Sequence, residues 1–163
     1  MTKKLAVFFL LAAAAACSSS ASGGGEGGGS GAPAAAAGLV AGAVETPTRL
    51  AESPRHAEWV TIRTGPTDSV RAWVVYPERS TPAPVVLVVH EIFGLSHWIR
   101  AVADQLAGEG FIAIAPDLLT MRNIPAGPDG APSPDVARAQ IATLDRDAIH
   151  RQLLAVANYG MAL

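Results

Sequence analysis

The chain has 163 residues, of which 12 are basic and 14 acidic, so its formal net charge is −2. Hydrophobic residues make up 50% of the sequence, but 32 residues are alanine, and 16 glycines and 12 prolines accompany them. No basic stripe of the kind that nucleic-acid binding requires occurs in the sequence, which argues against a nucleic-acid partner. The length allows one hydrophobic core at most.

Residues 1–16 have the layout of an export signal. Lys3 and Lys4 form a short positive region, and residues 5–16 carry no charge and end in small alanines. This apolar run is too short to span a bilayer as a stable helix and is typical of a secretory signal peptide. Cys17, which is the only cysteine, follows it directly.

The position of Cys17 resembles the lipobox of bacterial lipoproteins, in which the cysteine sulfur carries a diacylglycerol. Lipoboxes prefer leucine three positions before the cysteine, whereas this chain has Ala14. The resemblance implies lipidation at Cys17 and a membrane anchor facing the periplasm or the cell exterior. The alternative is an ordinary cleaved signal in which Cys17 is incidental.

The sequence divides into three parts. After the signal peptide at 1–16, residues 17–38 hold the lipidated cysteine and a segment of glycine, serine and alanine with one charge. Such a segment has no apolar face to bury and is expected to act as a flexible tether. Residues 39–163 form the predicted domain.

The domain begins with two segments in which apolar and polar residues alternate. Residues 58–63 and 70–76 have this period-two pattern, and the turn-forming segment 65–69 separates them, which predicts an antiparallel hairpin. Residues 85–90 and 111–116 are continuous apolar runs, as expected of strands covered on both faces. A helix with Ser96 as N-cap, ending at Gly108–Gly110, is predicted between them, giving a parallel βαβ unit.

The last third of the chain is predicted to be a loop and two helices. Residues 118–132 are rich in proline and glycine and read as loop. Ser133, followed by Pro134, predicts the start of a helix that runs to about Thr143. Another helix is predicted from Asp145 or Asp147 to near Gly160, with an apolar side made of Ile149, Leu153, Leu154 and Val156.

Two short motifs give the chain a family resemblance. The first predicted buried strand leads into His90-Glu91-Ile92-Phe93-Gly94-Leu95, and the second ends in Pro116-Asp117-Leu118. The pair resembles the dienelactone hydrolase family of α/β-hydrolases over about residues 57–160. The competing interpretation is a generic Rossmann-like βαβ unit, but the glycine fingerprint of dinucleotide binding is missing from the sequence.

The resemblance implies a partial α/β-hydrolase fold, with an N-terminal hairpin followed by parallel βαβ. It also implies hydrolysis of a small-molecule ester or lactone by nucleophilic acyl transfer, without a cofactor. By resemblance, the backbone amide of Ile92 is an oxyanion-hole donor, and Glu91 lies beside the nucleophile and helps to activate it. Physical reasoning points to the same loop, because ligands of open α/β sheets bind beyond the carboxyl ends of strands and a developing oxyanion needs exposed amides. Glu91 could instead be a strand-end carboxylate paired with an arginine.

The other candidate residues carry no assigned role in catalysis. His90 and Glu91 open a zinc-protease motif, but its second histidine would fall at Gly94, so no metal site is predicted. His56, His97 and His150 are scattered and are expected to be solvated or packed. Asp117 is expected to cap or turn the chain. The family also holds substrate carboxylates with arginines, and Arg122 and Arg138 lie in the corresponding irregular region, without an alignment that would transfer this role.

No nucleophile elbow is present in the sequence. The family uses Cys or Ser in a G-x-[C/S]-x-G turn, followed by Asp and His. Cys17 belongs to the export signal, and Ser30 lies in the glycine tether with no strand before it. We therefore expect the front half of a hydrolase, truncated before its nucleophile strand and inactive by itself. The alternatives are a non-enzymatic, lipid-anchored α/β binding or structural module and an unrelated α/β binding protein.

Overall fold

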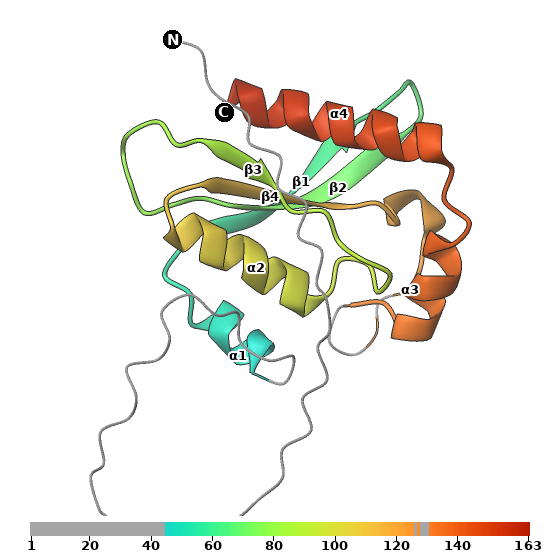
Figure 1. Cartoon of the computed structure of the whole chain (residues 1–163), viewed down its shortest axis with the longest axis horizontal. Coiled ribbons are helices and arrows are strands. Elements are labelled where there is room, and N and C mark those ends of the chain that lie inside the picture. Colours follow the sequence, from blue (N-terminus) through green and yellow to red (C-terminus); the bar gives the residue numbers. More distant parts are fainter. Residues whose placement is uncertain (1–44, 126, 128–130) are drawn as a thin grey trace, which may run out of the picture.

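The computed structural model describes residues 45–125, 127 and 131–163. The signal peptide, Cys17 and the tether predicted at 17–38 lie outside these residues. The described part is a mixed α/β fold (Figure 1), as the sequence predicts. Its elements in chain order are α1 (Thr46–Ala51), β1 (Ala57–Arg63), β2 (Ser69–Val75), β3 (Val85–Leu87), α2 (His97–Gly108), β4 (Ile112–Asp117), the 3₁₀ helix η1 (Thr120–Arg122), α3 (Pro134–Ile141) and α4 (Arg146–Ala162).

The four strands form one sheet in the order β1-β2-β4-β3. The predicted hairpin is confirmed, because β1 and β2 pair antiparallel with Trp59 opposite Trp73. The predicted parallel unit is confirmed as well, since β3 pairs parallel with β4 and α2 connects them. β4 also pairs antiparallel with β2, which makes it an inner strand.

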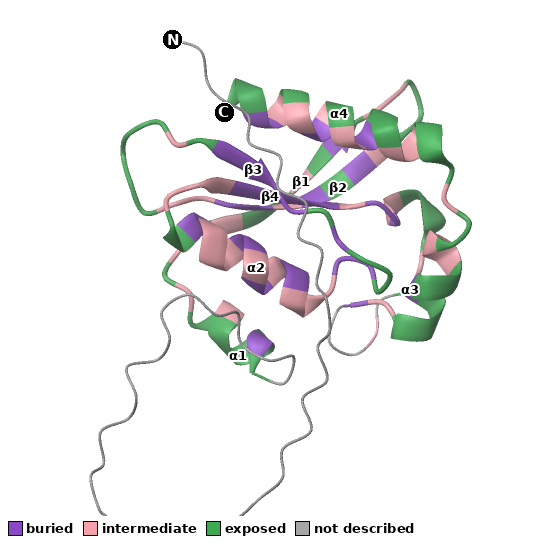
Figure 2. Cartoon of the chain, viewed as in Figure 1, coloured by how far each residue is buried: buried purple, intermediate pink, exposed green. Residues whose placement is uncertain are grey.

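Two helices cover the two faces of the sheet. Figure 1 shows α2 on one face and α4 on the other. Successive residues of a strand point to opposite faces, so Ala113 and Ala115 of β4 pack on the α2 side while Ile114 packs on the α4 side. Figure 2 shows the result: β3 and β4 are mostly buried, α4 exposes its outer side, and α2 is buried or half-buried over nearly its whole length. Among the described residues, no helix is long and apolar enough to cross a membrane.

The first predicted parallel strand is shorter than expected. Residues 85–90 were predicted to be strand, but β3 ends at Leu87. The N–H of Val88 still donates to the carbonyl of Ile114, 2.8 Å away. Beyond this bond the chain turns away from β4, which leaves Val89 exposed and His90 buried. The apolar run therefore predicts the strand to Leu87 and the burial of Val88, but not where the chain leaves the sheet.

The helix boundaries agree closely with the sequence. Ser96 is the N-cap of α2, and its hydroxyl accepts from the Ile99 N–H. Asp145 caps α4 in the same way, through the Ala148 N–H. Ser133 precedes α3 without a side-chain capping bond, and α3 ends at Ile141 rather than near Thr143.

The predicted apolar side of α4 needs one correction. Val156 is fully buried against the sheet, but Leu154 is 53% exposed. The helix also continues past Gly160, which is buried inside it. A Cβ at Gly160 would lie 2.7 Å from Val85 Cγ1 and 2.9 Å from Ile114 Cδ1. The glycine thus lets α4 approach the sheet closely, whereas the sequence suggested that it ends the helix.

A partly buried ion pair attaches the segment after α1 to α2. Arg55 donates from Nε to Asp104 Oδ1 over 2.9 Å and from Nη2 to Oδ2 over 2.5 Å, and the Ser53 hydroxyl also donates to Oδ1. The exposed fractions of the Arg55 and Asp104 side chains are 20% and 15%. Such two-pronged, charge-assisted bonds are stronger than those between neutral groups.

We predict that Asp104→Ala lowers the free energy of unfolding by about 1.5–3 kcal/mol, because three donors lose a charged acceptor. Asp135→Ala is the matched control, since it removes an arginine pair whose side chains are 60% and 89% exposed. Exposed pairs contribute little to stability. Urea unfolding of both variants measures the difference, and equal losses would contradict the assigned role of Asp104.

Candidate active site

The loop after β3 forms a tight turn at residues 91–94. The N–H of Gly94 donates to the carbonyl of Glu91 over 3.2 Å, which closes the turn. Gly94 has a φ of 74°, a left-handed conformation that glycine adopts without strain. A Cβ at this position would lie 3.2 Å from Leu119 Cδ1, so the turn packs closely against the chain after β4.

Glu91 and Ile92 lie next to each other on the exposed side of this turn. The Glu91 carboxylate accepts a hydrogen bond of 2.9 Å from the backbone N–H of Phe93. Ile92 is 49% exposed, and among the described residues none accepts a hydrogen bond from its N–H. The turn thus presents one amide and one carboxylate to the surroundings beyond the sheet.

The open alternative for Glu91, a pair with an arginine, finds no support in the geometry. In the described part of the chain, the arginine–carboxylate pairs join Arg55 to Asp104 and Arg138 to Asp135. Glu91 instead bonds within its own turn. Its carboxylate is exposed and lines a groove, where it can accept further donors.

His90 is the buried residue that precedes the turn. Its ring Nδ1 lies 2.9 Å from the carbonyl oxygen of Glu91, and its Nε2 lies 3.1 Å from the backbone nitrogen of Leu118. A carbonyl only accepts and a backbone N–H only donates, so these two partners select the neutral ring with its proton on Nδ1. Burial lowers the pKa of His90 below its ordinary value of 6.5, which is consistent with the neutral form.

Asp117 ends β4 beside His90. Its Oδ1 accepts from the N–H of Leu119 over 3.1 Å, so the carboxylate turns the chain, as the sequence suggested. The carbonyl of Asp117 accepts from the hydroxyl of Thr120, and this hydroxyl in turn accepts from the N–H of Arg71 on β2. Burial raises the pKa of Asp117, and the Leu119 N–H, His90 and Arg71 partly oppose the shift.

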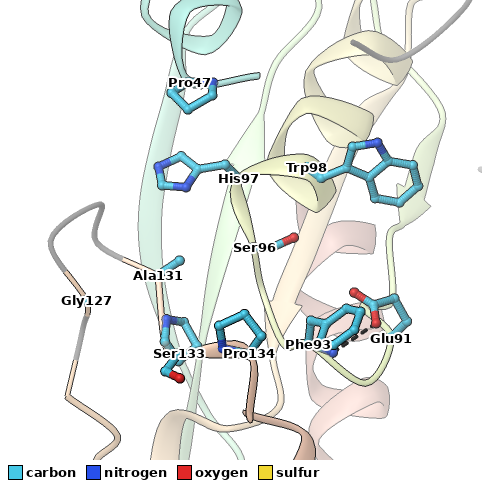
Figure 3. A pocket seen from close by; sticks show the side chains of 11 residues that line it. Pro47, Glu91, Phe93, Ser96, His97, Trp98, Gly127, Ala131, Ser133 and Pro134 are labelled. Atoms are coloured by element: carbon cyan, nitrogen blue, oxygen red, sulfur yellow. Dashed lines mark hydrogen bonds between the residues drawn. The ribbon is translucent and has the colours of Figure 1, made fainter. Parts of the chain in front are cut away.

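Two open grooves flank the start of α2. One has a volume of about 910 Å³ and is lined by Glu91 and Phe93 together with Trp98 and the segment 131–134. In Figure 3, Glu91 and Phe93 lie on the loop after β3, and the wall opposite comes from the start of α3. The second groove, of about 720 Å³, is lined by Asp117, Arg71 and Arg100, and by Trp59, which the Arg71 guanidinium covers at 4.4 Å.

The other candidates from the sequence lie in local contacts. Arg122 donates to the carbonyl of Thr143, and Arg138 pairs with Asp135 on the exposed surface of α3. His56 stacks on Tyr76, and His150 is exposed on α4. His97, by contrast, lies at the start of α2 and lines both grooves. Among the described residues, no group of three or more His, Cys, Asp or Glu side chains could hold a metal ion.

The sequence missed how His90 and Asp117 lie together. A signal is present in the sequence, because His90 ends one predicted parallel strand and Asp117 follows the other, and the carboxyl ends of parallel strands meet at one edge of the sheet. In the sequence, His90 belongs to the family motif and to an incomplete zinc motif, and neither assigns it a role. The structure instead makes it a bridge between the turn at 91–94 and the chain that leaves β4.

Comparison with known proteins assigns this arrangement to a class and a family. The parallel strands with a turn of exposed groups at their carboxyl ends are those of an α/β-hydrolase sheet. The sequence model of the dienelactone hydrolase family matches residues 70–160. Because this match covers more than half of the chain, the chain belongs to the dienelactone hydrolase family.

The matches to individual proteins span only part of those proteins. A "Putative carboxymethylenebutenolidase" of Escherichia coli (strain K12) is 48% identical over 52 residues, which are 31% of this chain and 19% of the relative. A structure called "Putative Dienelactone Hydrolase", from Klebsiella pneumoniae, is 27% identical with a TM-score of 0.53, covering 66% of this chain and 44% of that one. A dienelactone hydrolase-like promiscuous phosphotriesterase from metagenomic libraries is 25% identical with a TM-score of 0.52, covering 66% and 43%. The chain thus spans about a fifth of the matched curated relative and less than half of these structures.

We predict that stability falls as the pH drops below about 6.5, because the unfolded chain then protonates His90 while the fold resists it. This contribution is fully present above 6.5 and is lost as the pH falls through the lower pKa of the folded state. Asp117 acts in the opposite sense: its raised pKa favours the fold below 3.8, and this gain disappears as the pH rises through the folded value.

Urea unfolding at pH 7.5 and 5.5 tests the His90 part. The free energy of unfolding should fall more steeply for the wild type than for His90→Leu, by at most about 1.4 kcal/mol per pH unit. Subtracting the variant removes the contributions of the other histidines. Parallel pH dependences would show that His90 is not held neutral by the fold.

Proposed function

We propose that the chain is the N-terminal part of an exported hydrolase that cleaves a carboxylic ester or lactone by nucleophilic acyl transfer. The observation that carries this proposal is the turn at 91–94, where Ile92 is 49% exposed and its N–H has no acceptor among the described residues. An amide held in this way can stabilise the oxyanion of a tetrahedral intermediate. The membership of the dienelactone hydrolase family supports the same chemistry.

Glu91 supplies the second functional group of this proposed site. Glu91 directly precedes the oxyanion donor Ile92 in the sequence. Its carboxylate accepts a hydrogen bond of 2.9 Å from the Phe93 N–H. In the complete enzyme it lies beside the nucleophile and helps to activate it. One bond to a backbone N–H leaves acceptor capacity on both carboxylate oxygens for that contact.

The sheet offers a position for the strand that carries the nucleophile. Among the described residues, β3 pairs only with β4. Its three residues are nonetheless buried, since α2 and α4 cover both faces. A parallel strand added beside β3 would end close to the turn at 91–94, because the carboxyl ends of parallel strands share one edge. The 163 residues contain no nucleophile elbow, so by themselves they are inactive as a covalent hydrolase.

The substrate is a small molecule, and the groove beside Glu91 supports this assignment. Most residues of its wall are apolar or small, including Phe93, Trp98 and Pro134, and its volume of about 910 Å³ suits a small ligand. Export favours an ester or lactone met outside the cytoplasm. As part of this proposal, residues 1–16 act as a signal peptide and a lipid on Cys17 anchors the enzyme to a membrane in the cell envelope.

We predict that the purified 163-residue chain releases no burst of p-nitrophenol from p-nitrophenyl butyrate. The gene read past the codon for Leu163 should encode a G-x-[C/S]-x-G elbow, in frame or after a frameshift. The chain extended through that elbow and the later Asp and His should hydrolyse the ester. A stop codon with no elbow in any frame would favour a non-enzymatic, lipid-anchored binding or structural module.

In the extended enzyme, Ile92→Pro should lower kcat by about 10²–10³ because it removes one oxyanion donor. Ile92→Ala is the matched control, since it shortens the side chain and keeps the N–H. Circular dichroism of both variants verifies the fold. Equal activities of the two variants would contradict the role of the Ile92 amide.

We predict that cells expressing the chain incorporate radiolabelled palmitate into it, and that Cys17→Ala abolishes the label. Cys17→Ser serves as the close control, because it keeps the size of the side chain and removes the sulfur that carries the lipid. Autoradiography of the immunoprecipitated protein gives the readout. Label that persists in either variant would refute the lipid anchor.

A further inference from the structure

The proposed oxyanion donor belongs to a peptide unit that is held from its other end. The N–H of Ile92 and the carbonyl of Glu91 are parts of the same peptide group. This carbonyl accepts two hydrogen bonds, one from His90 Nδ1 at 2.9 Å and one from the Gly94 N–H at 3.2 Å. Because a peptide unit is planar and trans, fixing the direction of its C=O also fixes the direction of its N–H.

The His90 ring is itself immobilised. Its second nitrogen accepts from the Leu118 N–H over 3.1 Å, and the side chain is 7% exposed. The ring therefore connects the peptide at 91–92, after β3, to the peptide at 117–118, after β4. Two strand ends determine its orientation, whereas the Gly94 bond lies within the turn and ties it to neither strand.

The hydrogen bond from His90 Nδ1 to the Glu91 carbonyl also makes the Ile92 N–H a stronger donor. A bond to the carbonyl oxygen draws electron density through the peptide group and makes its N–H a better donor, an effect of about 10–30% per bond in chains of hydrogen bonds. Direction and polarity are the two properties that an oxyanion donor needs before the reaction begins.

We propose that His90 is a positioning residue for the oxyanion hole: its Nδ1–H orients and polarises the Glu91–Ile92 peptide, and its Nε2 anchors the ring to β4. The inference rests on the proposed function of the Ile92 amide. His90 does not touch the substrate and takes no proton from it. It acts through the peptide that follows it.

Protonation of the ring breaks this arrangement. With a proton on both nitrogens, Nε2 can no longer accept from the Leu118 N–H, so the ring loses its anchor on β4. The charged groups that act on the ring are Asp117, from β4, and Glu91, from its own loop, and both favour the protonated form. Arg71 of β2 acts on Asp117. Burial outweighs both carboxylates and keeps the ring neutral near neutral pH.

Nitrogen-15 NMR of the full 163-residue chain tests the inference without any need for enzymatic activity. At pH 7.5 the His90 ring should carry its proton on Nδ1 and none on Nε2. On acidification below pH 6.5, the Ile92 amide signal should shift with the same midpoint as the His90 ring. A ring protonated on Nε2 at pH 7.5, or an Ile92 signal that does not follow the ring, would overturn the inference.

Two variants separate positioning from a merely structural role. His90→Gln keeps one donor and one acceptor on the side chain, so the Ile92 signal should stay near its wild-type position and lose its titration. His90→Leu removes both bonds, so the Ile92 signal should move, and hydrogen exchange at Leu118 should speed up by about tenfold. An Ile92 signal unchanged in a folded His90→Leu protein would refute the assignment.

Gln152→Leu is the matched control. Gln152 is a buried polar residue on α4, with 8% exposure and no partner for its Oε1 among the described residues. Its replacement should leave the Ile92 signal in place.

In the extended enzyme, His90→Leu should lower kcat at unchanged KM, and His90→Gln should restore it. A gene without an elbow would refute the proposed hydrolase but would leave these NMR results unaffected. An Ile92 signal that does not follow the titration of the His90 ring would refute only the role of His90.

Discussion

The arrangement of this domain depends on the inner position of β4. β4 is the strand that joins the antiparallel hairpin to the parallel unit, because it bonds to β2 on one side and to β3 on the other. Alternate residues of β4 also contribute to both layers of the core, with Ala113 and Ala115 toward α2 and Ile114 toward α4. A one-residue change of register in β4 would exchange these two sets, so the alternation of small and large apolar side chains favours the observed register.

The parallel pairing of β3 with β4 also determines where the functional groups lie. It brings the chain after Leu87 and the chain after Asp117 to the same edge of the sheet. The first forms the turn that exposes Ile92, and the second supplies the Leu118 N–H to His90. The geometry of the turn thus results from strand pairing together with one buried ring, which is how a loop becomes as well defined as the sheet that supports it.

The sequence predicts most of the elements, because these have local causes, but it predicts neither α1 nor η1. Alternation in β1 and β2, the N-caps Ser96 and Asp145, and the run at 85–90 are properties of neighbouring residues. The errors have non-local causes. β3 ends early because its last residues leave the ladder for the turn, Leu154 is exposed because only part of α4 faces the sheet, and Gly160 is a packing site against Val85 rather than a helix end. The family motif predicts the roles of Glu91 and Ile92, whereas the proposed role of His90 depends on the position of Leu118, 28 residues away.

The proposed oxyanion donor is held by residues close to it, whereas the proposed nucleophile requires a further strand. The described hydrogen bonds that shape the turn come from residues 90–94 and from Leu118, which lie in the loops that follow β3 and β4. The donor is therefore preorganised before any further strand pairs with β3. A nucleophile on a strand beside β3 would meet an amide that already has its direction and polarity. The cost of ordering that amide is then met by the folding of the βαβ unit rather than at the moment of reaction.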